Sequence, residues 1–505
     1  MTEIEPQPAS EGRPAAPARH DHHRAPLVEG IGRYQEDSIV PFSTPGHKGG
    51  QCVDDQFRTL LGAAAFAADI PLGGGVDDTH FHGDSLGRAE ALAAAVWGAE
   101  RSFYLVNGSS AGNHAFLLAT LRPGDEVIVA RDLHKSLLVA LILTGARPVY
   151  VAPRLHPRLN VGLGVVAADV DAALRDHPAA RLVALVSPSY CGVPSDLAAI
   201  VEVAHHYDVP VFVDEAWGPH FHLHPDLPPS AMSSGADGAV ISTHKVLGSL
   251  TQAAILHLQG SRIDHQRVAA AVGMMQTTSP AATILASIDG CRRQMALHGR
   301  ALLERAIALA HDARARLLAL PGIEVLDAAR LGIPALDPTK LVIDVHGLGL
   351  TGFRAEAELR DRFGVQPEMS DLVGVVCLVT IGDTTASIER LVGAFTTLAT
   401  ERRTVVDVGA GFLARSSGAA IAPGVQALSP RDAFFAPSRV VALRDAVGEV
   451  SAELVIPYPP GIPVLAPGDV VSVEKVAYLE AGAAHGMYLS GPADPALKTL
   501  RVVAS

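Results

Sequence analysis

Short apolar runs alternate with longer amphipathic stretches between about residue 36 and residue 290. The runs are rich in β-branched residues and bounded by turn-forming residues, which predicts buried strands. They occupy residues 125–130, 147–152, 181–187, 209–214 and 238–242. The stretches between them, such as 134–146 and 195–208, predict helices. Strands and helices repeated in this way indicate an α/β fold with a mainly parallel sheet covered on both faces.

The remainder of the chain divides into three further parts. Residues 1–35 are rich in Pro, Ala, Glu and His without periodicity, so we expect a disordered N-terminal tail. A long helical pattern over residues 282–320 leads out of the major unit, which we place at 36–290. Strand patterns then recur, predicting a small α/β domain over 291–400. The turn-dense remainder, 401–505, forms a last unit.

Charge and cysteine usage restrict the environment and the partners. The formal net charge of −13 argues against a nucleic-acid or anionic-membrane partner. The four cysteines are far apart and form no CxxC pair, as expected in a reducing compartment. The N-terminus lacks the apolar core of a secretory signal, and the apolar run 137–146 is too short to span a bilayer. We expect a cytoplasmic protein.

The stretch LVNGSSAGN, residues 105–113, joins a strand to a helix through a loop of small residues. Ser109, Ser110 and Ala111 would expose backbone N–H groups at a helix N-terminus, with two hydroxyl groups beside them. Such a loop can hold a phosphate. An ordinary capped turn is the alternative.

Three further polar side chains follow predicted strands, where open parallel sheets bind ligands. Asp214 ends a strand and could hold a pyridinium nitrogen, a metal or a helix terminus. Lys245 follows Ser242-Thr243-His244 after the next strand, and a partly desolvated lysine there can form a Schiff base. A surface lysine beginning a helix is the alternative. His134 could stack on a planar ring or cap its helix.

Taken together, these features are the parts that pyridoxal phosphate requires. They supply a phosphate-binding loop, a ring-stacking residue, an acid for the ring nitrogen and a lysine for the aldehyde. Asp214 precedes Lys245 by roughly one strand–helix–strand unit, as in fold-type I pyridoxal phosphate enzymes. The combination predicts that cofactor more strongly than any one motif does.

The sequence resembles the ornithine/lysine/arginine decarboxylase family of fold-type I enzymes. The resemblance covers nearly the whole chain after the tail. It is carried by STPGHKGG (43–50), GVDDTHFHGDSLGRAEALAA (75–94), FYLVNGSSAGN (103–113), RDLHKSLLVALILTGARPVYVAP (131–153), VDEAWGPHF (213–221), STHKVLGSLTQ (242–252), TTSP (277–280) and YPPGIPVLAPGD (458–469). The chain resembles the short form, without the N-terminal wing domain. Residues 36–290 would be the cofactor-binding major domain and 401–505 the C-terminal decarboxylase domain.

The resemblance also implies roles for individual residues. Lys245 would bind the cofactor covalently, Asp214 would keep its ring nitrogen protonated, and His134 would stack on the ring. The phosphate would be held by the remaining residues that match the family pattern: Ser109, Ser110, Ala111, Ser242, His244 and, from the neighbouring subunit, Thr278 with Thr277 as a second candidate. Lys245 or His244 would assist reprotonation at Cα. A homodimer or larger assembly is implied because each site is completed at a subunit interface.

The predicted reaction is decarboxylation of a basic amino acid, with arginine favoured over lysine and ornithine. Trp217, Cys191 and the run after TTSP depart from the short-form pattern, which concerns substrate preference more than reaction type. Candidates for the substrate's distal cation are the acids near the expected mouth of the site: Asp77, Asp78, Asp84, Glu368 and Asp371. The alternatives are another fold-type I reaction, such as transamination or aldol cleavage, an inactive regulatory homologue, and a metal-dependent hydrolase.

The run HFHLH places His220, His222 and His224 at alternate positions. In an extended segment they would share one face and could bind zinc. Pro219 and Pro225 flank the run and make a strand doubtful. We therefore expect these side chains to line the site near Asp214 and to pack around the cofactor, without a metal.

Overall fold

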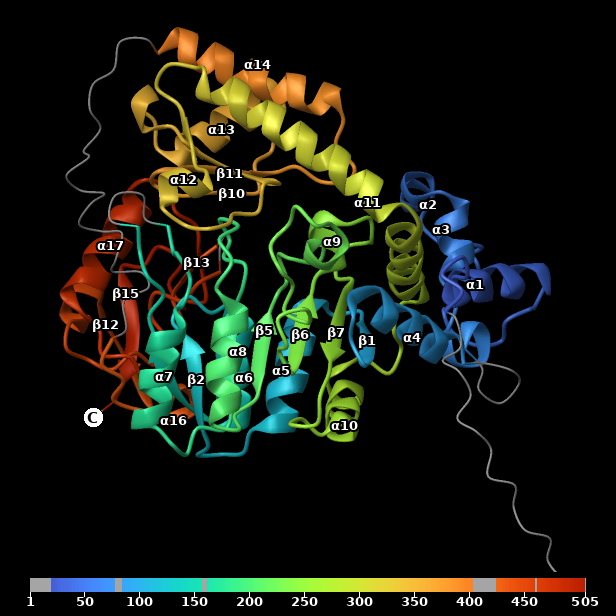
Figure 1. The fold of residues 1–505 in the computed structure, drawn as a ribbon, viewed down its shortest axis with the longest axis horizontal. Helices are drawn as coiled ribbons and strands as arrows, with labels where there is room; N and C mark the ends of the chain where they lie inside the picture. The colour runs from blue at the N-terminus through green and yellow to red at the C-terminus, as the bar shows by residue number, and fades with distance from the viewer. Residues whose placement is uncertain (1–19, 78–83, 157–160, 403–423, 459–460, 505) are drawn as a thin grey trace, which may run out of the picture.

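The computed structural model describes residues 20–77, 84–156, 161–402, 424–458 and 461–504. A seven-stranded sheet lies at its centre, in the order β1-β7-β6-β5-β4-β2-β3 (Figure 1). Its strands are β1 (Arg101–Leu105), β2 (Glu126–Ala130), β3 (Arg147–Val151), β4 (Val183–Val186), β5 (Val211–Asp214), β6 (Gly238–Ile241) and β7 (Ala254–Leu258). β7 runs antiparallel to both of its neighbours, and the other pairs are parallel. The five strands predicted from the apolar runs are confirmed, whereas β7 was not anticipated.

Helices cover both faces of this sheet. They are α4 (Ser85–Trp97), α5 (Gly108–Thr120), α6 (Lys135–Thr144), α7 (Ala167–Asp176), α8 (Leu197–His206), α9 (Thr243–Val246) and α10 (His265–Met275). Alternate residues of one strand enter opposite cores: Val127 and Val129 pack in the cluster of α5, α6 and α10, while Ile128 packs in the cluster of α7 and α8. Burial on both faces explains why these strands are continuously apolar.

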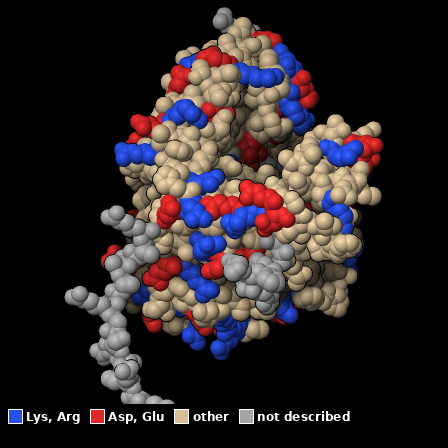
Figure 2. Space-filling view, turned by 90° about the vertical axis from the view of Figure 1, so that its right-hand side faces the viewer, with Lys and Arg blue, Asp and Glu red and all other residues tan. Residues whose placement is uncertain are grey.

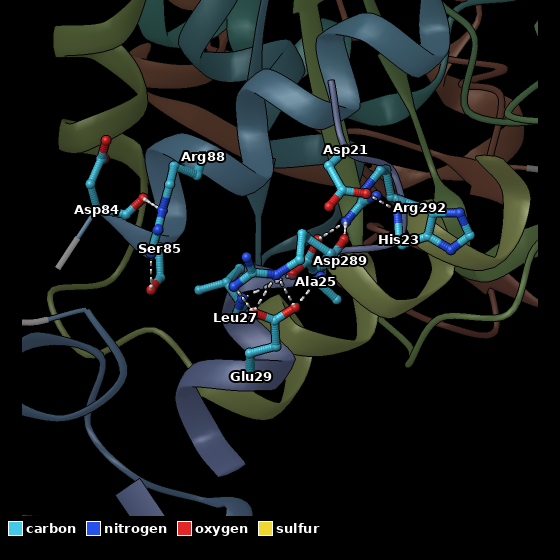
Figure 3. A network of polar contacts seen from close by, with 11 residues as sticks. Asp21, His23, Ala25, Leu27, Glu29, Asp84, Ser85, Arg88, Asp289 and Arg292 are labelled. Atoms are coloured by element: carbon cyan, nitrogen blue, oxygen red, sulfur yellow. Dashed lines mark hydrogen bonds and ion pairs between the residues drawn. The ribbon is translucent and has the colours of Figure 1, made fainter. Parts of the chain in front are cut away.

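Residues 20–35 differ from the predicted tail, because they are folded. Helix α1 (Pro26–Glu36) packs on α4 and on the long helix α11 (Ala282–Leu318). The Leu27 backbone N–H donates to Asp289 at 2.9 Å, and Asp289 also pairs with Arg292 at 2.6 Å (Figure 3). Both charged side chains are fully buried. The prediction of disorder is therefore wrong for this part, and residues 1–19 lie outside the described residues. Three short helices follow: α2 (Asp55–Leu61), α3 (Ala63–Ala68) and the π-helix η1 (Leu72–Val76).

A smaller antiparallel sheet, in the order β10-β11-β9-β8, lies beyond α11 and above the large sheet in Figure 1. Its strands are β8 (Glu324–Val325), β9 (Lys340–Asp344), β10 (Met369–Ser370) and β11 (Gly374–Leu378). The accompanying helices are α12 (Ala328–Leu331), α13 (Gly352–Phe363), α14 (Thr385–Glu401) and the 3-10 turn η3 (His346–Leu348). α11, α13 and α14 share one apolar core with this sheet. The predicted long helix and the strands after it are present.

The C-terminal segment packs beside β2 and α6. It contains α16 (Pro430–Phe435), β12 (Ser438–Ala442), η4 (Leu443–Ala446), β13 (Ile456–Pro457), α17 (Val473–Ala484), β14 (Leu489–Ser490) and β15 (Thr499–Val503). Arg131, just after β2, is buried and donates to the carbonyls of Pro463 and Val464 at 2.7 and 3.2 Å. It also pairs with Asp469 at 3.0 Å, as Lys475 does at 3.1 Å. These contacts hold Pro463, Val464 and Asp469 of the C-terminal segment against the large sheet.

The exposed charges are mixed on the face drawn in Figure 2, where lysine and arginine lie among aspartate and glutamate. The described part of the chain contains no helix long and apolar enough to cross a membrane. The cytoplasmic location stays a prediction.

Candidate active site

Three of the predicted site residues come together at the carboxyl ends of the parallel strands. Asp214 is the last residue of β5, Lys245 lies in α9 after β6, and His134 precedes α6 after β2. His134 interacts electrostatically with both Asp214 and Lys245. Figure 1 shows α9 at the edge of the large sheet that faces the smaller sheet. The sheet topology thus collects side chains that are far apart in sequence.

The Asp214 carboxylate is 3% exposed and is held by two N–H donors. Asn113 Nδ2 donates to Asp214 Oδ2 at 2.7 Å, and the Ala216 backbone N–H donates to Oδ1 at 3.2 Å. Asn113 also donates to Ser136 Oγ at 2.7 Å. These donors orient the carboxylate and stabilise its charge in a buried position. Sequence reasoning missed Asn113, whose signal is a polar residue one helical turn after the Gly-Ser-Ser loop.

His134 is held as a neutral ring beside this carboxylate. Its Nδ1 lies 2.7 Å from Ser136 Oγ and accepts the Ser136 backbone N–H at 3.2 Å. Burial lowers the pKa of His134 to about 4, helped by the charge of Lys245 and opposed by Asp214. On its other side lies Gly461 of the C-terminal segment, where an added Cβ would stand 3.1 Å from His134 Cδ2. The ring is therefore fixed in place and uncharged at neutral pH.

Lys245 has the protonation behaviour of a nucleophilic lysine. Its pKa is lowered to about 8, mainly by burial, which the charge of Asp214 opposes and that of Lys340 reinforces. Its Nζ lies 3.8 Å from the centroid of the Trp217 ring. A lowered pKa leaves a substantial fraction of the amine uncharged near neutral pH, as attack on a carbonyl requires.

Two residues of the smaller sheet also reach this region, and sequence reasoning assigned only one of them to the site. Lys340, the first residue of β9, is fully buried, with Nζ 4.2 Å from the centroid of Trp217. Glu368 precedes β10 and is exposed. Desolvation by the surrounding protein raises the pKa of Glu368, while Lys245 and Lys340 oppose that rise. The sequence signal for Lys340 was a lysine at the head of an apolar strand.

The loop before α5 forms an open recess. Gly108 has φ +69°, and a Cβ added there would meet no atom within 4 Å. Ser109 and Ser110 follow on the first turn of α5, half-buried, and Ala111 is buried. Across the sheet edge, Ser242 Oγ is buried and has no hydrogen-bond partner among the described residues. Open space at a helix N-terminus, with a buried hydroxyl left unpartnered, fits the phosphate of a cofactor.

His244 and Thr277 form hydrogen bonds with residues close in sequence, and Thr277 and Thr278 are exposed. His244 Nδ1 lies 2.8 Å from the Ala253 carbonyl oxygen, and burial lowers its pKa. Thr277 and Thr278 are exposed after α10, and Thr277 Oγ1 accepts the Ser279 N–H at 3.2 Å. Thr278 therefore faces the surface of this chain.

The acidic candidates for the substrate's distal cation lie in two places, at the start of α4 and beside the smaller sheet. Asp77 accepts the Ser85 N–H at 2.6 Å, at the start of α4. Asp84 lies at the same helix start, and Asp78 lies outside the described residues. Asp371 is on the smaller sheet and accepts the N–H groups of Val373 and Gly374 at 2.7 and 2.8 Å. Among the five candidates, Glu368 interacts electrostatically with Lys245.

The three histidines of HFHLH do not share a face. Phe221–Leu223 is a 3-10 turn, η2, so the extended geometry required for a shared face is absent. His220 Nε2 pairs with Asp337 at 3.2 Å, His222 Nδ1 lies 3.1 Å from Ser230 Oγ, and His224 Nδ1 accepts the Asp226 N–H at 3.2 Å. The described residues contain no group of three or more His, Cys, Asp or Glu positioned to hold a metal ion.

A cavity of about 150 Å³ adjoins this site where the two sheets and the C-terminal segment meet. Its wall includes Tyr190, whose ring lies 6.4 Å from that of Trp217 in an edge-to-face arrangement. Asp132, Met369 and Ile462 also line it, each from a different one of these parts. Tyr190, Trp217 and Met369 belong to one apolar cluster, and Trp217 carries the Lys245 amine over its ring. All three parts of the fold therefore contribute to the surroundings of the site.

A buried acid, a lysine of lowered pKa and an open glycine loop meet at the carboxyl edge of this sheet and define the candidate active site of an α/β enzyme. The family model of the Orn/Lys/Arg decarboxylase major domain matches residues 25–333, and that of the family's C-terminal domain matches residues 423–491. An arginine decarboxylase of Halalkalibacterium halodurans is 38% identical over 485 residues, which are 95% of this chain and 98% of that protein. The chain belongs to the Orn/Lys/Arg decarboxylase family, whose members are amino-acid decarboxylases.

Solved structures show the same fold. The lysine decarboxylase of Francisella novicida superposes with a TM-score of 0.81 at 21% identity, covering 95% of this chain and 81% of that one. A ureidoglycine-glyoxylate aminotransferase of Bacillus subtilis superposes with a TM-score of 0.51 at 15% identity, covering 65% of this chain and 88% of that one. The predicted fold-type I architecture is confirmed.

Proposed function

We propose that this protein removes the α-carboxylate of arginine with pyridoxal phosphate, giving agmatine and carbon dioxide. The observation that carries the proposal is the electrostatic interaction of buried Asp214 with Lys245 at one sheet edge, in a chain whose full-length relative is named an arginine decarboxylase. The open turn at Gly108 and the unpartnered Ser242 hydroxyl support the cofactor. Lysine and ornithine remain the alternative substrates.

The chain's own residues have distinct tasks in this reaction. Bound pyridoxal phosphate supplies an electron sink for the charge left when carbon dioxide departs. Lys245 Nζ attaches the cofactor, and its pKa of about 8 lets the same amine hold or release a proton near neutral pH. Asp214 holds the proton on the ring nitrogen. His134 presents an uncharged ring for stacking, and Ser109, Ser110, Ala111 and Ser242 bind the phosphate. His244 is the second candidate for a proton donor to the substrate.

A panel of basic amino acids tests the reaction. Purified protein with pyridoxal phosphate is incubated separately with arginine, lysine and ornithine, and both carbon dioxide and the amine are measured. We expect agmatine and carbon dioxide in equal amounts from arginine. A keto acid without carbon dioxide would instead indicate transamination. Binding of the cofactor without any product would favour an inactive regulatory homologue.

We assign the distal guanidinium of the substrate to Glu368. This carboxylate is exposed and interacts electrostatically with Lys245, whereas Asp371 is engaged by two backbone N–H groups. We expect Glu368→Gln to raise the KM for arginine by about tenfold, because a charge-assisted hydrogen bond is lost. Steady-state kinetics measure the effect, with Asp371→Asn as the comparison. A larger rise in the KM for arginine in Asp371→Asn than in Glu368→Gln would contradict the assignment.

We also propose a homodimer or larger homo-oligomer. Several large apolar side chains are exposed between α1 and the end of α2, and two more after α9 and in α10: Ile39, Val40, Phe42, Phe57, Leu60, Leu61, Leu250 and Met274. Clustering of this kind marks a protein interface. Thr278 would then reach the phosphate of the neighbouring subunit. Sedimentation equilibrium of the purified protein measures the mass, and a monomer at micromolar concentration would contradict the proposal.

A further inference from the structure

Lys340 is a buried cation that the described protein leaves without a partner. The side chain is fully buried, and its Nζ forms neither a hydrogen bond nor an ion pair among the described residues. This Nζ lies over the face of Trp217, 4.2 Å from the ring centroid, and interacts electrostatically with Asp337 and Glu368. Lys245 Nζ lies 3.8 Å from the same centroid. The distance between the two Nζ atoms therefore cannot exceed the sum of their distances to the Trp217 centroid.

Asp337, the nearest acid in sequence, acts on Lys340 electrostatically but forms no hydrogen bond or ion pair with its Nζ. Asp337 Oδ1 accepts the Thr339 backbone N–H at 3.0 Å and the Thr339 hydroxyl at 2.6 Å. Its carboxylate also pairs with the buried His220 at 3.2 Å. The stem of Lys340 is fixed as well, since Gly192 packs so closely that an added Cβ would lie 3.2 Å from Lys340 Cδ. Packing against Gly192 thus fixes the stem of Lys340, with its Nζ over the ring of Trp217.

A buried ammonium without a partner destabilises a folded protein, because its hydration is lost without compensation. Its retention beside the reacting lysine indicates that an anion arrives there in the working enzyme. The cofactor's phosphate is accounted for by the turn at Gly108 and by Ser242, at the helix N-terminus. The remaining anion of the reaction is the substrate's own carboxylate.

We propose that Lys340 binds the α-carboxylate of the amino-acid substrate and so selects amino acids over their amine products. This inference rests on the proposed decarboxylation. The ion pair exists only until the carboxylate leaves as carbon dioxide, so it stabilises the bound substrate more than the transition state. Its loss should therefore raise KM while leaving kcat nearly unchanged.

The test compares Lys340→Met with the wild-type holoenzyme. We expect the KM for arginine to rise at least about tenfold and kcat to stay within about threefold, the pattern for lost ground-state binding. Agmatine has the same guanidinium but no carboxylate, and its dissociation constant, measured from the visible spectrum of the holoenzyme, should change less than about twofold. Lys340→Arg, which keeps the charge, should recover most of the arginine affinity. Equal weakening of arginine and agmatine would overturn the proposal.

Thermal melting separates this role from a structural one. Lys475 is also a buried lysine, but it is paired with Asp469 at 3.1 Å. We expect Lys475→Met to lower the melting temperature of the holoenzyme, and Lys340→Met to leave it unchanged or raise it, because the second change removes an unpaired charge. If Lys340→Met lowered the melting temperature as much as Lys475→Met does, the inference would be overturned.

The two proposals fail in different ways. If the wild-type holoenzyme releases no carbon dioxide from any basic amino acid, the proposed function is wrong. Binding of arginine and of agmatine to the wild type and to Lys340→Met still measures the carboxylate contact directly in that case. A preference for arginine that disappears in Lys340→Met supports the contact, and a preference unchanged by the substitution refutes it.

Discussion

Replacement of Lys245 by alanine should abolish both cofactor attachment and turnover. The structure places its amine beside Asp214 and Trp217, with a pKa lowered to about 8 by burial. The other lysines of this region differ in their contacts, since Lys340 enters from the smaller sheet and Lys135, after β2, has its Nζ over the ring of Tyr458. We expect kcat to fall by at least about a thousandfold, as with other nucleophile deletions.

Absorbance and carbon dioxide release measure the two consequences separately. The visible band of the bound cofactor should be absent from Lys245→Ala and present in Lys498→Ala, a matched change at an exposed lysine. Added pyridoxal phosphate should not restore activity, because the cofactor then lacks its covalent anchor. Turnover by Lys245→Ala at a rate near that of the wild type would exclude the assignment of this lysine.

The residues that sequence alone could place are those tied to the parallel strands. Asp214 and Lys245 each follow a strand whose apolar run is unambiguous, and parallel strands bring their carboxyl ends to one edge. Spacing along the chain therefore predicted proximity in space. His134 was found for the same reason, since it follows β2. Their roles toward the cofactor remain proposals.

The residues that sequence could not place depend on packing between separate parts of the chain. Lys340 reaches Trp217 because the smaller sheet closes over the edge of the large one, and no local pattern encodes that approach. Helix α1 was not predicted either, because the contacts that anchor it come from a part of the chain far away in sequence. Its surroundings are rich in Pro, Ala and His, and it is anchored by Asp289 and Arg292 on the distant helix α11. In HFHLH, the flanking prolines argued against a strand, and the chain forms a 3-10 turn between them, a conformation that the alternating pattern does not encode.

Asp214→Asn should retain the fold and lose most of the reaction rate. The substitution keeps the size of the side chain, and its amide oxygen can still accept the hydrogen bond that Asn113 now donates to Asp214 at 2.7 Å. It removes the negative charge that would keep the cofactor's ring nitrogen protonated. Without that proton the ring withdraws electrons less effectively, and charge developing at Cα is stabilised less in the transition state. We expect kcat to fall by about a hundredfold to a thousandfold, a range typical of lost electrostatic stabilisation.

Three measurements distinguish this effect from damage to the site. The melting temperature should stay near that of the wild type, since the change removes a buried charge without creating a cavity. Asp196→Asn neutralises another aspartate, the N-cap of α8, and should leave kcat unchanged because Asn caps a helix as well as Asp does. Asp214→Glu keeps the charge in a tightly packed position and should recover part of the rate. If Asp214→Asn turned over at the wild-type rate, the negative charge at this position would have no part in catalysis, and the acid would serve only to orient Asn113 and the turn that follows β5.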